Sequence, residues 1–292
     1  MPEKIFALYH YPPADRERAQ RLFLDAGLLD VVVSLDRLDG HQKIELSDEE
    51  TALRLRVAAG QHGLRPPTIR RELHPTDAEL RAAPLLYMRV WIHHAPAGHP
   101  RADTTYDEGR ACSACGDGVR QTSPLILTKR EVPRGGPLGV IGDDVLVHES
   151  FAEEMLAAGL DGFRFEPVLG PERRALPWRQ LVVEHEMAMM TVETRGLARG
   201  RGTDERPCTQ CGRDGWFDGT DDPFVPAYAA AALDGMPDVA VTAERFGTGV
   251  WRNPIHGRRW LANRRLIVRP AMHAFFRARK ARGVRFTPVL VT

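Results

Sequence analysis

All four cysteines of the chain belong to two copies of one short motif, and this constrains the fold more than any other feature. The first copy contains Cys112 and Cys115, and the second contains Cys208 and Cys211. In both copies two residues separate the cysteines and a glycine follows them. Two intervening residues let both sulfurs face one ion from a tight turn, and the glycine tolerates the positive φ that such a turn needs. The pattern therefore predicts one structural Zn²⁺ ion bound by four thiolates.

The separation between the two pairs is unusual for a zinc site. Ninety-two residues lie between Cys115 and Cys208, whereas a compact zinc ribbon has roughly 15–20. The ion would therefore tie together two distant parts of the chain. Two disulfides, two reactive dithiols or an iron ion with the same ligands are the alternatives. The glycines that follow each pair disfavour the helix that a thioredoxin-like motif opens.

Length and composition indicate a soluble globular protein with one large or two ordinary domains. Of 292 residues, 43% are hydrophobic and 27% are charged. No apolar run reaches the roughly 18 residues that a membrane span needs, and the first residues lack the pattern of a signal peptide. Together with cysteines of the metal-binding type, these features predict a cytoplasmic protein with no membrane partner.

The charge is unevenly distributed, although the net charge is only +1. Residues 252–292 contain eleven Arg and Lys and no acidic residue, which leaves 29 basic against 39 acidic residues, a net of −10, in the first 251. The basic segment could cover an acidic surface of the chain itself, or it could bind nucleic acid. Trp251 and Trp260 could stack on a single strand, bind a protein or pack internally. The nucleic-acid hypothesis relies on Arg258, Arg259, Arg264 and Arg265.

A second duplicated element follows each cysteine pair. Segments that begin at Val145 and Leu266 align without a gap at an offset of 121 residues, and both end in Gly-x-Arg-Phe-x-Pro-Val-Leu. Large apolar residues spaced four apart lie within each segment, which is typical of a helix face. These residues are Phe151 and Met155 in one copy, and Met272 and Phe276 in the other. The predicted fold class is therefore α+β, with pseudo-duplicated strand–helix–strand units joined by a zinc-knuckle pair of four cysteines.

The remaining sequence predicts how the chain is divided. Residues 1–100 contain no cysteine and predict an extra α/β region, with capping boxes that begin at Ser47 and Thr76. Residues 171–206 are rich in Arg, Gly and Pro and are predicted to be a connector. The two CxxCG halves are residues 101–170 and residues 207–292, of which the second includes the basic C-terminal end.

No catalytic motif stands out in the sequence. It contains no phosphate-binding loop and no nucleophile elbow, and His185-Glu186 lacks the second histidine of a zinc-protease helix. His93, His94 and His99 precede the first cysteine pair, but four cysteines already complete a tetrahedron. A binding protein is therefore favoured, while an enzyme with scattered active-site residues remains an alternative.

At these residues the chain resembles the bacterial double-CXXCG motif proteins. The resemblance rests on the two motifs, on Glu244-Arg-Phe246 and on the ending from Leu266 to Val289, and it covers roughly residues 105–292. Some members of that family are immunity proteins, so the resemblance implies direct binding and neutralisation of a cognate toxin. It also implies no catalytic residue. The metal ligands that it implies are Cys112, Cys115, Cys208 and Cys211.

Overall fold

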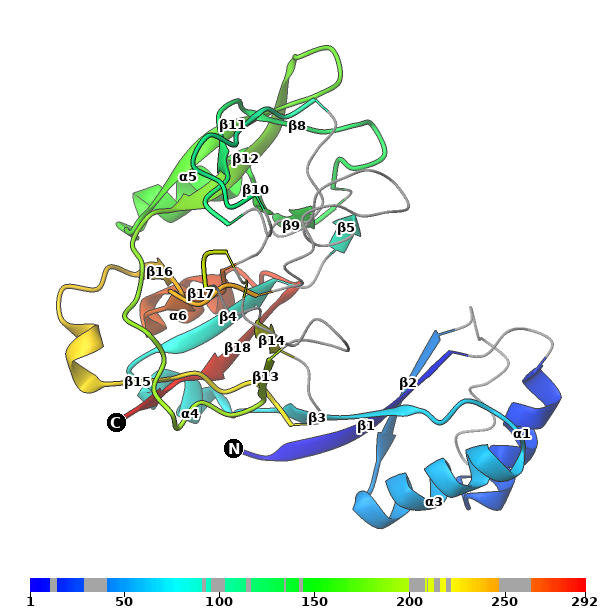
Figure 1. Cartoon of the computed structure of the whole chain (residues 1–292). Coiled ribbons are helices and arrows are strands. Elements are labelled where there is room, and N and C mark those ends of the chain that lie inside the picture. The colour runs from blue at the N-terminus through cyan, green and yellow to red at the C-terminus, as the bar shows by residue number, and fades with distance from the viewer. Residues whose placement is uncertain are drawn as a thin grey trace. The chain divides into compact units, whose positions relative to one another are not determined.

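The chain combines helices with several sheets and is therefore α+β (Figure 1). Its contacts divide it into unit 1, residues 1–74 and 219–224, and unit 2, residues 75–218 and 225–292. The computed structural model describes residues 1–10, 15–28, 41–90, 93–95, 103–113, 117–133, 135–141, 144–199, 208, 210–212, 216–218, 222–246 and 264–292.

Unit 1 is a three-stranded antiparallel sheet whose core is completed by two helices. Its elements are β1 (Glu3–His10), α1 (Arg16–Asp25), β2 (His41–Leu46), α3 (Glu49–Gln61) and β3 (Thr68–Leu73). β1 lies between β2 and β3, and Ala7 of β1 packs with Leu22, Phe23 and Leu55 of the helices. The cap of α3 is Asp48, one residue later than predicted, and its side chain accepts a 2.7 Å hydrogen bond from the Thr51 amide.

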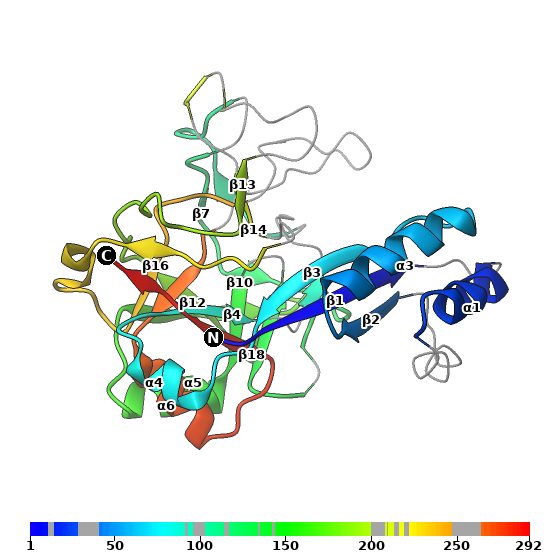
Figure 2. The same cartoon turned by 90° about the horizontal axis from the view of Figure 1, so that it is seen from below.

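Unit 2 contains two larger sheets. The six-stranded sheet has the order β5 (His93–Ala95), β9 (Leu138–Ile141), β10 (Asp144–His148), β12 (Ala175–Val183), β11 (Phe163–Leu169) and β8 (Leu125–Ile126). The four-stranded sheet has the order β16 (Val239–Val241), β17 (Leu266–Val268), β4 (Leu86–Val90) and β18 (Val284–Pro288). Figure 2 shows the helices α4 (Asp77–Ala82), α5 (Glu149–Ala157) and α6 (Pro270–Ala278) gathered on one side of this unit.

The two sheets have the same internal arrangement. In one, β10–α5–β11 places its strands on either side of β12; in the other, β17–α6–β18 places its strands on either side of β4. Each middle strand is antiparallel to both of its neighbours. Gln180 of β12 pairs with Leu146 and Glu166. Tyr87 of β4 pairs with Ile267 and Thr287, which lie 121 positions after Leu146 and Glu166 in the sequence.

The middle strands also connect the two sheets to each other in matching ways. The segment that starts with β4 continues to His93, which pairs in parallel with Val140 of the six-stranded sheet. The segment that starts with β12 continues to Glu186, which forms a parallel bridge to Val241 of the four-stranded sheet. Each segment therefore supplies the middle strand of one sheet and then an edge partner of the other.

The two strand–helix–strand segments share one hydrophobic core. Their strands and helices confirm the prediction from the sequence, and Gly162 and Gly283 both have a φ of 86° before the second strand. The Phe151 ring of α5 lies 5.3 and 5.4 Å from the ring centroids of Phe275 and Phe276 in α6. Burying side chains of this size contributes about 1.5–3 kcal/mol each, so the helix contact is a main source of stability in unit 2.

Two of the predicted boundaries differ from the observed units. The N-terminal stretch of unit 1 ends at His74 rather than near residue 100, because α4 packs on α6 and β4 pairs with β17 and β18. The segment 171–206, predicted to be a connector, contains β12 and β13 (Leu197–Arg199). Its arginines and prolines obscure a strand whose Trp178 and Gln180 side chains are buried. The division into halves at 101–170 and 207–292 stays a prediction.

Candidate metal centre

Each cysteine motif lies in a loop that a short antiparallel ribbon closes. β6 (Tyr106–Asp107) pairs with β7 (Arg120–Gln121) around the first motif. β13 pairs with β14 (Trp216–Asp218) around the second motif. A ribbon brings the two ends of its loop together, so the intervening residues must turn back on themselves. That geometry is suited to presenting closely spaced sulfurs to one ion.

The turns themselves depend on glycine and on backbone hydrogen bonds. In the first loop, the Cys112 amide donates to the Asp117 carbonyl over 2.7 Å. Gly118 has a φ of 91°, and a Cβ atom there would lie 2.7 Å from the Arg110 carbonyl oxygen, which excludes any larger residue. In the second loop, Gly212 has a φ of 71° and donates to the Cys208 carbonyl over 2.7 Å. This is the positive-φ glycine that the sequence predicts after a cysteine pair.

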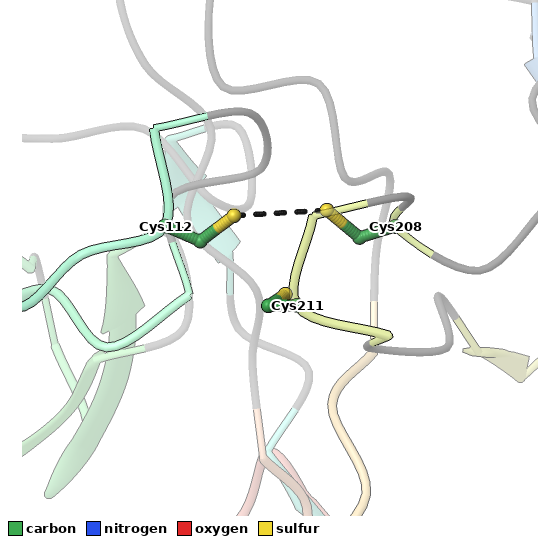
Figure 3. A group of neighbouring side chains, drawn as sticks. All are labelled: Cys112, Cys208 and Cys211. Carbon is green, nitrogen blue, oxygen red and sulfur yellow. Dashed lines mark hydrogen bonds between the residues drawn. The ribbon is translucent and has the colours of Figure 1, made fainter.

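Three thiols from the two motifs meet at one place (Figure 3). The Sγ atoms of Cys112, Cys208 and Cys211 all lie within 4.8 Å of one another. The Cys112 and Cys208 sulfurs are 3.6 Å apart, far longer than the ~2.05 Å of a disulfide. Two sulfurs at ~2.3 Å from a tetrahedral zinc ion lie about 3.8 Å apart. The spacing of the thiols therefore fits a shared metal ion.

The fourth predicted ligand, Cys115, lies outside the described residues. The trio is accessible, since Cys112 and Cys208 are half-buried and Cys211 is exposed. Two further contacts hold the surroundings together. The Ser113 hydroxyl donates to the Gln210 side-chain oxygen over 2.7 Å, which links the two motifs directly. Arg245 forms a 3.4 Å ion pair with Asp117, just beyond the first pair.

Two other residues that the sequence singles out, Arg264 and Arg265, make contacts elsewhere in the described part of the chain. Arg264 pairs with Glu186, and the Arg265 guanidinium lies 4.7 Å from the centre of the Phe246 ring. These contacts support the interpretation that this part of the basic segment covers the chain itself. Among the candidates that lie outside the described residues are Arg258, Arg259, Trp251, Trp260 and His99.

A buried polar pair was not predicted from the sequence. Glu244 is only 5% exposed and accepts a 2.6 Å hydrogen bond from the Met190 amide. Burial raises the pKa of Glu244, and burial together with this nearby carboxylate raises the pKa of Tyr228. The signal in the sequence was slight, because an acidic residue between short apolar runs usually lies at the surface.

Comparison with known proteins gives no match: no family model fits the sequence, and no curated protein matches it significantly. Among the described helices, none is both long enough and apolar enough to cross a membrane. The geometry of the site is therefore the main guide to function.

Proposed function

We propose that this chain is a zinc-stabilised binding protein in which Cys112, Cys115, Cys208 and Cys211 hold one structural ion. The observation that carries the proposal is the meeting of thiols that are 96 positions apart in the sequence. Four thiolates leave no open coordination position for water or substrate, so the ion would serve folding rather than catalysis.

The proposal includes an internal duplication of unit 2. We define the first repeat as residues 86–169 and the second repeat as residues 175–291. The matching registers support this assignment, and so does a pair of hydrogen bonds beside the ribbons. The Ile126 amide donates to the Thr104 hydroxyl, and the Ala227 amide donates to the Thr194 hydroxyl, both over 3.0 Å. Each repeat would then contribute one cysteine pair and lend its first strand to the sheet of the other.

Metal content tests the first part of the proposal. We expect about one zinc ion per purified, reduced chain, and a melting temperature that falls when a chelator is added, because metal binding and folding are linked. Cys112→Ser should lose the ion. Ser113→Ala is the matched control, since it removes only the hydrogen bond to Gln210 and should keep the metal. A chain without metal, whose melting is unchanged by chelator, would contradict the proposal.

The partner that we propose is a protein toxin, which the chain would neutralise by direct binding as an immunity protein. The two motifs and the C-terminal ending support this choice through their resemblance to the double-CXXCG proteins. The net charge of −10 over the first 251 residues also favours a basic partner, such as a nuclease, through electrostatic steering. Arg264 and Arg265 already make contacts within the chain, so the basic segment gives less support to nucleic-acid binding.

Survival beside toxin-producing cells tests this second part. Cells that lack the gene should be killed by kin that deliver the toxin, and the intact gene should restore survival. The purified chain should bind the toxin, with an association rate that falls as salt is added. Unchanged survival of the deletion strain would refute the immunity role. A mobility shift with single-stranded nucleic acid at low salt, without toxin binding, would favour the alternative instead.

A further inference from the structure

One residue of the first cysteine loop connects the candidate metal centre to the rest of unit 2. The backbone carbonyl of Asp117 accepts the 2.7 Å hydrogen bond from the Cys112 amide, which closes the turn around the first motif. The carboxylate of the same residue forms an ion pair with Arg245 Nε over 3.4 Å. Asp117 therefore fixes the turn through its backbone and links that turn to Arg245 through its side chain.

Arg245 belongs to the second repeat, and the residues on either side of it are buried. Glu244 is 5% exposed and accepts the 2.6 Å hydrogen bond from the Met190 amide, and Phe246 is fully buried. Buried and half-buried residues alternate through positions 242–246, as in an extended segment whose successive side chains point to opposite sides. The Arg245 side chain therefore leaves a backbone that the core holds, on the side opposite to its two buried neighbours.

Hydrogen bonds also fix the chain just before Arg245. The Thr242 amide donates to the Arg265 carbonyl over 2.9 Å, and the Arg265 amide donates to the Thr242 hydroxyl over 3.0 Å. The Thr242 hydroxyl in turn donates to the Glu244 carbonyl over 2.9 Å. These bonds extend the pairing of β16 with β17 up to Glu244, so the base of the Arg245 side chain is well positioned to reach the cysteine loop.

The charge of the candidate metal centre gives a cation at this position a purpose. Four thiolates around one Zn²⁺ ion carry a net negative charge. The Asp117 carboxylate lies two residues after Cys115 and adds a like charge, which opposes the binding of ionised thiolates nearby. The Arg245 guanidinium compensates that carboxylate, and an arginine side chain remains charged throughout the physiological pH range.

We propose that Arg245 is a positioning residue for the metal centre, which holds the turn of the first motif through Asp117 and compensates its charge. The inference rests on the zinc site of the proposed function. The second repeat then stabilises the cysteine turn of the first repeat, in addition to supplying Cys208 and Cys211. Arg245 is not a ligand. It acts like the outer groups that orient ligands at metal sites, whose loss typically lowers metal affinity 10–100-fold.

The same ion pair contributes little to the stability of the fold. The side chains of Arg245 and Asp117 are each 31% exposed, and ion pairs at such positions are largely screened by water. Substitution of Arg245 should therefore affect zinc affinity more than the stability of the metal-free chain. Arg277 offers a matched comparison, because it forms an exposed ion pair with Asp77 that joins α6 to α4 rather than to a cysteine loop.

The test measures the zinc affinity of the full chain by competition with a chelator, beside the melting temperature of the metal-free chain. Arg245→Gln should weaken zinc binding about tenfold or more, with a metal-free melting temperature within about 4 °C of the wild type. Arg245→Lys should recover most of the affinity, because it keeps the charge. Arg277→Gln should bind zinc within about twofold of the wild type, because its site is distant and independent.

Three results of this test would overturn the inference. The first is an unchanged zinc affinity in Arg245→Gln. The second is an equal loss of affinity in Arg277→Gln, which would mean that any lost ion pair has the same effect. The third is a lysine variant that binds zinc no better than the glutamine variant.

A double-mutant cycle identifies the group through which Arg245 acts. In an Asp117→Asn background, Arg245→Gln should weaken zinc binding by less than about twofold, because the carboxylate that Arg245 holds and compensates is absent. A loss as large as in the wild-type background would refute the assignment to Asp117.

The outcomes separate this inference from the proposed function. A wild-type chain that holds no zinc would end the proposed metal site and this inference with it. A wild-type chain that holds zinc, with an Arg245→Gln variant that binds it equally well, would lose only the inference and keep the proposed site.

Discussion

Gly162→Ala should destabilise unit 2 more than a matched glycine substitution a few residues away. Gly162 has a φ of 86°, which costs a residue with a Cβ atom about 1–2 kcal/mol. A Cβ atom there would also overlap the Val239 carbonyl oxygen and lie 2.7 Å from the Pro237 ring. Overpacking of this kind costs about 1–3 kcal/mol. The total expected loss is therefore about 2–5 kcal/mol.

Gly159→Ala is the control because it shares the backbone strain without the overlap. Gly159 has a φ of 73°, and a Cβ atom added to it would meet no atom within 4 Å. It should therefore lose only about 1–2 kcal/mol. In a unit of this size each kcal/mol lowers the melting temperature by about 2–4 °C. Thermal unfolding should then show a drop of about 4–20 °C for Gly162→Ala and about 2–8 °C for Gly159→Ala.

The comparison tests how the two sheets of unit 2 are joined. The neighbouring Asp161 amide donates to the Asp238 carboxylate over 3.2 Å, and the Asp238 amide donates to the Asp161 carboxylate over 2.8 Å. Gly162 is therefore the point where the start of β11 lies directly against the segment that leads into β16. Equal drops for the two variants, or a larger drop for Gly159→Ala, would refute this contact.

Two further predictions concern α4 and α6. Thr76→Ala should lower the stability of unit 2 by about 1 kcal/mol, because the Thr76 hydroxyl accepts a hydrogen bond from the Glu79 amide in a complete capping box. Denaturant unfolding would check this, and an unchanged free energy of unfolding would show that α4 contributes little. Burial lowers the pKa of His273 in α6, so the unfolded chain binds its proton more readily. The stability contributed by neutral His273 should therefore be present above about pH 6.5 and be lost as the pH falls through that value toward the lowered pKa. The measurement is the free energy of unfolding as a function of pH, from which His273→Gln should remove this step. An unchanged pH profile in the variant would contradict the prediction.

The sequence predicts local structure in this chain better than it predicts strand partners. The strand–helix–strand segments were predictable because Phe151, Met155, Met272 and Phe276 recur at helical spacing between apolar strands and precede a turn glycine. The pairing of the middle strands was not predictable, because β4 and β12 each pair with segments whose identity no local pattern encodes. β12 is also obscured by its polar residues, of which Gln180 is buried through hydrogen bonds to Gln121 and Asp144.

The candidate ligands of the metal site were predictable from the sequence, but the structure that surrounds them was not. The spacing within each cysteine pair and the glycine after it indicate a turn that presents two thiols to one metal ion. The structure brings Cys112, Cys208 and Cys211 together. The ribbons and the hydrogen bond from Ser113 to Gln210 depend on residues without a metal-binding signature.

The pairing of the middle strands, β4 and β12, bears on the structural role of the proposed metal ion. The two sheets of unit 2 are already held together by β4, by β12 and by the contact of Phe151 with Phe275 and Phe276. The proposed ion would therefore add to contacts that already hold the sheets together. The proposed ion would act mainly on the two loops, whose two- and three-residue ribbons would order poorly alone. The metal centre that we propose would add to the stability of unit 2 mainly by ordering these two loops, which would suit a protein that works by presenting a fixed surface to a partner.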